Sequence, residues 1–148
     1  YPRLIGRLAP EKQVISRPCP NLAALVELVV NDPGMRPLIE TDLRDDLDDL
    51  VNEEHVDCCL LGCTHYPLAA AAFAAVLGEG VTLIDCAAEA AKAAAEALKE
   101  AHLLAGGTAP ASPRYYFTAL PPQPARLLAR RLLGEDFTPQ LAEPGDKG

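Results

Sequence analysis

The stretch LLGCTHYP, residues 60–67, joins an apolar run to a turn that carries a thiol, a hydroxyl and an imidazole. The run from Val56 to Leu61 is apolar apart from Asp57, which is typical of a strand covered on both faces of a parallel sheet. Gly62 lets the backbone turn, and Pro67 suits the first turn of a following helix. We therefore expect a buried strand that ends at this stretch and a helix that begins after it.

The segments on either side alternate between strand and helix patterns. Asn21 is a plausible N-cap for a helix, and Gly78 is expected to end a later one. Strands are predicted over 13–16, 56–61, 81–84 and 114–117, and helices over 22–30, 39–50, 68–77, 87–101 and 124–133. This alternation predicts βαβ units and therefore an α/β fold, a parallel sheet flanked by helices.

The domain organisation follows from changes in composition. We expect an α/β domain over residues 1–102, a linker over 103–113 that is rich in glycine and proline, a strand–helix segment over 114–136 and a tail over 137–148. The chain begins at Tyr1 without a methionine, and its first residues read like the end of an element. We therefore expect a fragment or a processed product.

The composition excludes several classes of partner. The net charge of −8 argues against a nucleic-acid backbone, which requires clustered Lys and Arg. No apolar run is long enough to span a bilayer, and no signal peptide or lipidation motif is present, so we expect no membrane partner. Five cysteines, an odd number in mostly apolar surroundings, favour a reduced, cytoplasmic protein over a disulfide scaffold.

The turn after the strand is the strongest candidate for chemistry. In open α/β sheets, reactive groups collect at the carboxyl ends of strands, beside the N-termini of the following helices. The positive end of a helix favours a thiolate and attracts carboxylates, so Cys63 can act as base or acid. Thr64 can hydrogen-bond a substrate, and His65 can shuttle or steady the proton.

Two other interpretations of Cys63 remain open. It can be a small core residue, as Cys58 and Cys59 within the apolar strand are expected to be. It can also be a metal ligand with Cys59 and His65, although a paired CxxC and a fourth ligand are missing. The other two histidines, at positions 55 and 102, are expected at the surface.

Four segments resemble the glutamate racemase family, within the cofactor-independent Asp/Glu racemase superfamily. LLGCTHYPL resembles the second cysteine motif of that family, and Glu27 follows Pro18-Cys19-Pro20 at the spacing of its "CP…LVE" segment. VTLIDCAAEAAKAAAEAL is similar to the strand and helix that come next, with Asp85-Cys86 where many members have Asp-Ser. YYFTALPPQPARLLARRLLGED looks like the C-terminal segment, without the aromatic residue usually found ahead of its helix.

The resemblance implies an isomerase that interconverts L- and D-glutamate without pyridoxal phosphate or another cofactor and without a metal. Two cysteines would face the substrate from opposite sides, with Cys63 as the second of them and His65 assisting it. Thr64 would bind glutamate, and Glu27 would be an auxiliary acid/base group. The D-glutamate would serve peptidoglycan synthesis, and thereby cell wall biogenesis and cell shape. A homodimer is one assembly consistent with the resemblance.

The sequence departs from the family in its first half. The Asp-Ser motif near the start and the first catalytic cysteine, in a Cys-Asn-Thr motif, do not occur. The resemblance implies that the chain holds the second α/β domain and the returning C-terminal piece of the first, so the isolated chain is expected to lack two-base racemase activity. The alternatives are a racemase of aspartate or another small amino acid, and an inactive remnant that acts as a binding module.

Overall fold

The computed structural model describes residues 1–107, 112–134 and 137–142. The elements of the first 52 residues are α1 (Pro2–Leu8), α2 (Leu22–Asn31), the 3₁₀ helix η1 (Pro33–Met35) and α3 (Arg36–Asn52). Then follow β1 (Cys58–Leu61), the 3₁₀ helix η2 (Tyr66–Ala69), α4 (Ala70–Leu77), β2 (Thr82–Asp85) and α5 (Cys86–Glu100). The last elements are β3 (Tyr115–Phe117), α6 (Gln123–Leu133) and β4 (Pro139–Leu141).

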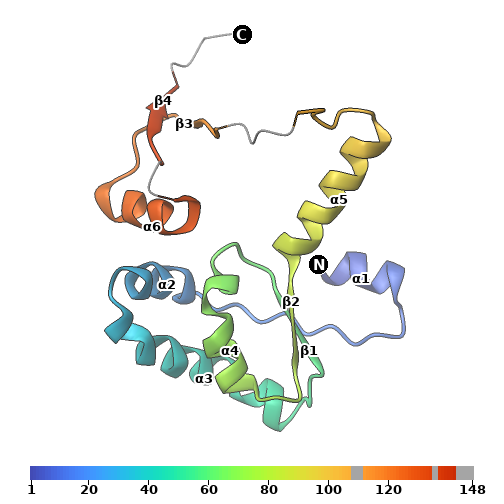
Figure 1. Ribbon diagram of the computed structural model, residues 1–148. Helices are drawn as coiled ribbons and strands as arrows, with labels where there is room; N and C mark the ends of the chain where they lie inside the picture. The colour runs from blue at the N-terminus through green and yellow to red at the C-terminus, as the bar shows by residue number, and fades with distance from the viewer. Residues whose placement is uncertain (108–111, 135–136, 143–148) are drawn as a thin grey trace.

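Parallel strand pairing confirms the predicted α/β fold. β1 and β2 pair in parallel, in a register that runs from Cys58 opposite Thr82 to Leu61 opposite Asp85. The connection between them passes through η2 and α4, as a parallel pair requires a crossover. Figure 1 shows α2, α3 and α4 grouped beside this pair, with α5 extending away from it. The carboxyl ends of β1 and β2 therefore lie at one edge of the sheet.

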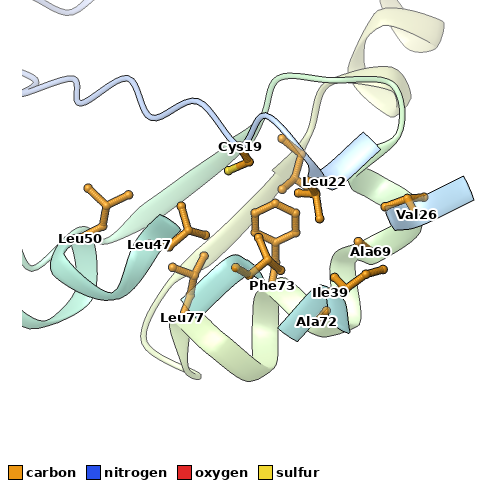
Figure 2. Packing of buried hydrophobic residues seen from close by; sticks show 12 residues of the cluster. Cys19, Leu22, Val26, Ile39, Leu47, Leu50, Ala69, Ala72, Phe73 and Leu77 are labelled. Atoms are coloured by element: carbon orange, nitrogen blue, oxygen red, sulfur yellow. The ribbon is translucent and has the colours of Figure 1, made fainter. Parts of the chain in front are cut away.

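The core is formed by α2, α3, α4 and the end of β1. On α3, four apolar residues at spacings of four, four and three are all buried, namely Ile39, Leu43, Leu47 and Leu50, and Leu43 is completely so. They meet Leu22 and Val26 of α2 and the ring of Phe73 of α4, which lies within the cluster in Figure 2. The helical stripe that the sequence predicts is therefore what positions α2, the helix that carries Glu27.

The prediction of strands covered on both faces is wrong for the described residues. Only Leu61 is buried in β1, Cys58 is exposed, and β2 is exposed at three of its four positions. The physical reason is one-sided packing, since α2, α3 and α4 form the core while α1 and α5 bury no residue. Side chains on the other face of the strands therefore meet solvent.

Of two smaller predictions before β1, one is wrong and the other is confirmed only in position. Residues 13–16 form no strand, because a strand requires a hydrogen-bonded neighbour and β1 pairs with β2 in a two-stranded sheet. Asn21 occupies the predicted N-cap position of α2, but its side chain makes no capping bond; its Nδ2 donates to Asp42 Oδ1 at 3.1 Å. α2 itself, the later stop at Gly78 with φ of 83°, and α4, α5 and α6 are confirmed within a few residues.

The segment expected to be a tail instead contributes to a small second cluster. β4 pairs in parallel with β3, and Phe137 is 2% exposed, with its ring 4.8 Å from that of Tyr115 between centroids. α6 packs against α2, and its Leu128 is buried. The ring contacts of Phe137 with Tyr115 and Phe117 therefore connect this segment to β3. Residues 108–111 of the expected linker, 135–136 and 143–148 lie outside the described part of the chain.

Candidate active site at the end of β1

The turn between β1 and η2 carries Cys63, Thr64 and His65, as the sequence predicts. The Tyr66 N–H donates to the Cys63 carbonyl at 3.2 Å and closes the turn. Pro67 then lies in the first turn of η2, where its missing N–H costs no helical bond. Cys63 and His65 are half-buried and Thr64 is exposed, so all three are at the surface at the carboxyl end of the strand.

Glu27 reaches this turn from α2. Its Oε1 lies 3.0 Å from His65 Nε2, and His65 Nδ1 lies 3.4 Å from Thr64 Oγ1. An ionised carboxylate can only accept, so Nε2 must carry the proton in that bond. In the neutral ring Nδ1 then accepts from the Thr64 hydroxyl, and in the charged ring it donates to it. One imidazole therefore connects a hydroxyl to a carboxylate, beside a free thiol.

The packing of α2 explains why Glu27 lies at this position. Val26 is 1% exposed and anchors the buried face of the helix together with Leu22. The next residue is rotated by about 100° around the helix axis, which brings Glu27 to the rim of that face. Its side chain is 49% exposed, against 29% for His65. The pair is therefore partly screened by water, and its main effect is to orient the imidazole.

The other thiols differ from Cys63 in their surroundings. Burial raises the pKa of Cys19 to about 11, with further contributions from Asp46 and Asp42, so this thiol stays protonated at neutral pH. Burial also raises the pKa of the half-buried Cys59. Cys58 was expected in the core and is exposed, because it lies on the uncovered face of β1. All five cysteines are free, and Cys63 alone lies on the turn that Glu27 approaches.

The remaining candidates from the sequence form no second site in the described residues. Within the described ranges, no set of three or more His, Cys, Asp or Glu side chains is arranged to hold a metal ion. His55 and His102 are exposed, each with a positive φ at the end of a helical segment. None of the helices in the described residues is both long and apolar enough to cross a membrane.

Sequence reasoning assigned no contact to Tyr66. Its hydroxyl donates to the Cys19 carbonyl at 3.2 Å, and its ring lies 5.6 Å from that of Phe73 between centroids. The only sequence signal is an aromatic residue with a polar tip directly after the reactive turn, because a buried tyrosine hydroxyl usually requires a partner. The partner lies 47 residues away in the chain, so the spacing could not identify it.

These side chains define the chemical character of the site. A thiol, a hydroxyl and a carboxylate-bound imidazole lie at the carboxyl edge of a parallel α/β unit, and groups of these types can carry out acid/base chemistry.

Comparison with known proteins finds homologues among the glutamate racemases. No family model matches the chain. A glutamate racemase of Syntrophus aciditrophicus is 39% identical over 122 residues, which are 82% of this chain and 43% of that protein. The crystal structure of a glutamate racemase isoform from Bacillus anthracis matches with a TM-score of 0.82 at 29% identity, over 97% of this chain and 52% of that one. The structure of the Francisella tularensis glutamate racemase in complex with D-glutamate matches with a TM-score of 0.80 at 25% identity, over the same shares.

The chain is thus a homologue of the glutamate racemases over most of its own length. It spans about half the length of the curated relatives that it matches.

Proposed function

We propose that this chain provides one wall of a glutamate racemase active site, with Cys63 as the acid/base thiol of that wall. The observation that carries the proposal is the turn itself, where a free thiol stands beside an imidazole bound to Glu27, in a homologue of the glutamate racemases. In this role the chain is part of an isomerase that interconverts L- and D-glutamate.

The proposed step is proton transfer at the α-carbon without a cofactor. The Cys63 thiolate takes the α-proton of L-glutamate, the S–H bond forms, and the electron pair of the C–H bond remains on the α-carbon beside the carboxylate. Thr64 donates a hydrogen bond to the substrate. His65, oriented by Glu27, steadies the negative charge that moves from sulfur to substrate. In the reverse direction the Cys63 thiol returns the proton.

Racemisation also requires a second acid/base group on the opposite face of the α-carbon. We propose that the other half of the racemase fold supplies it, and that this chain alone does not racemise glutamate. The α/β domain over 1–102 would form one wall, and the segment over 114–136 would complete the other domain. The exposed faces of β2 and α5 support this arrangement, since a further domain would cover apolar surface there.

The wider role follows from the proposed reaction. D-Glutamate would enter peptidoglycan synthesis in the cytoplasm and so support cell wall biogenesis and cell shape. The net charge of −8 supports a small-molecule substrate over nucleic acid. We also propose that the racemase assembles as a homodimer.

Two alternative functions make different predictions. A racemase of aspartate or another small amino acid would use the same thiol on the α-carbon of a substrate with a shorter side chain. A binding module would hold the substrate without proton transfer, and the half-length match to the relatives favours this alternative for the isolated chain.

The test is hydrogen–deuterium exchange at the α-carbon in deuterated water, followed by mass spectrometry with L-glutamate, D-glutamate and L-aspartate. A half-site that retains Cys63 removes the α-proton of L-glutamate and returns a deuteron to the same face. We expect label in L-glutamate only, loss of labelling in Cys63→Ser, and normal labelling in the matched control Cys58→Ser, which removes an exposed thiol of β1, the strand that leads to the turn.

A second arm adds a separately produced polypeptide that contains the other half of a related racemase. Racemisation is expected only in the mixture. Labelling that survives Cys63→Ser, or racemisation by the isolated chain, would contradict the proposal. Label in aspartate but not glutamate would support the first alternative. Glutamate binding without label in either arm would support the binding module.

A further inference from the structure

Two hydrogen bonds from neighbouring residues tie the turn to α2. His65 Nε2 lies 3.0 Å from Glu27 Oε1, and the Tyr66 hydroxyl donates to the Cys19 carbonyl at 3.2 Å. The same carbonyl accepts the N–H of Leu22 at 3.4 Å, at the first residue of α2. The tyrosine is therefore attached where the helix begins, and the histidine is attached further along it.

The separation of the two attachments determines what they do together. Leu22 and Glu27 are five residues apart on α2, which corresponds to about 7.5 Å along the helix axis. A single attachment would leave the turn free to pivot about one point. Two attachments at this separation fix its orientation relative to the helix. The imidazole of His65 is then held in the orientation in which it bonds to the Glu27 carboxylate.

The hydroxyl of Tyr66 is separable from the packing of its ring. The ring contacts that of Phe73, which is 2% exposed in the core. This contact does not involve the oxygen, so a phenylalanine at position 66 retains it. Burial raises the pKa of Tyr66 above its ordinary value, so the hydroxyl remains a protonated donor at neutral pH. Without it, the Cys19 carbonyl still accepts from Leu22.

We infer that Tyr66 is a positioning residue, whose hydroxyl holds the Cys19 carbonyl and thereby fixes the turn so that His65 meets Glu27. Its significance for catalysis rests on the proposed racemase function, whereas its effect on the His65–Glu27 pair does not. The inference is therefore tested on the pair itself.

The experiment measures the side-chain ¹⁵N and ¹H signals of histidine in the full chain at pH 7. The chain has three histidines, and His65→Asn assigns the signal of interest by its loss. The exposed His55 and His102 are internal references. Glu27→Gln calibrates the shift that follows when the carboxylate is lost. We expect Tyr66→Phe to produce at least half of that shift at His65 and none at the references.

The matched control is Tyr116→Phe, which removes the hydroxyl of a 56% exposed tyrosine in β3 and is expected to leave all three signals unchanged. Folded and unfolded chains give separate signals, so lost stability alone lowers the intensity of the folded signal without moving it. The inference would be overturned if the His65 signal of Tyr66→Phe stayed at its wild-type position while Glu27→Gln moved it. Complete loss of the folded signal would also overturn it, because the hydroxyl would then be required for folding. Neither result depends on racemisation.

Discussion

Replacing Cys19 with alanine should change how stability depends on alkaline pH. Cys19 is 7% exposed, and the pKa of its thiol rises from 9.0 to about 11. Burial is the main cause, because it removes water from the thiolate. Asp46, Asp42 and Cys59 add to it, since each places negative charge near the sulfur. The thiol of Cys19 is therefore a neutral group of the core.

The sign of the effect follows from the raised pKa. Below pH 9 the thiol is protonated in both the folded and the unfolded chain, so its contribution to stability is fully present. Between pH 9 and pH 11 only the unfolded chain ionises, and the contribution is lost. The shift from 9.0 to about 11 corresponds to about 2 to 3 kcal/mol in total, of which about 2 kcal/mol is lost by pH 10.5.

The assay is urea unfolding with a thiol reductant from pH 7 to pH 10.5. At neutral pH, Cys19→Ala should cost about 1 kcal/mol through lost packing. By pH 10.5 this variant should be more stable than the wild type by about 1 kcal/mol, since only the wild type loses the Cys19 contribution. Val26→Ala, which shortens a buried side chain without removing an ionisable group, should differ from wild type by a constant amount. A constant difference for Cys19→Ala would refute the reasoning.

Two further predictions concern the scaffold of the site. Leu43→Ala should lower the free energy of unfolding by about 2 to 5 kcal/mol in urea titrations, because Leu43 is 0% exposed at the centre of the core; a cost below about 1 kcal/mol would contradict that placement. Asp85→Ala should cost about 1 kcal/mol, because its carboxylate accepts the Ala87 N–H at 2.8 Å and caps α5; Asp85→Asn, which can accept the same bond, should recover most of this loss.

Local patterns predicted the helices well because these patterns depend on few partners. The apolar spacing on α3 marks the side that must be buried, and the structure buries Ile39, Leu43, Leu47 and Leu50 as expected. The parallel pairing followed from the alternation of strands and helices, since each crossover restricts the topology. The strand predicted over 114–117 is confirmed as β3, whereas β4 was missed, because the short run Pro139–Leu141 carries too little alternation to be recognised.

In the candidate site, too, the sequence predicted the local turn but not the contacts with residues far away in the chain. The turn of Cys63, Thr64 and His65 could be placed because glycine and proline mark its ends. The approach of Glu27 could be anticipated from a family resemblance but not from spacing, since it lies 38 residues before His65. The bond from Tyr66 to the Cys19 carbonyl was not foreseen, because no side-chain pattern marks a backbone acceptor.

The failed prediction of covered strands bears directly on the proposed function. Proton removal and delivery on opposite faces of one carbon require two groups, and a single thiol can serve only one face. The described chain brings its acid/base groups to the turn from β1 and α2. Cys58 and Ile84 are meanwhile exposed on strands whose apolar runs are typical of a covered sheet. If the other half of the fold completes the site, it should also reduce the exposure of these strands. Protection of Cys58 from alkylation in the mixture of halves, in parallel with racemisation, would connect the two observations.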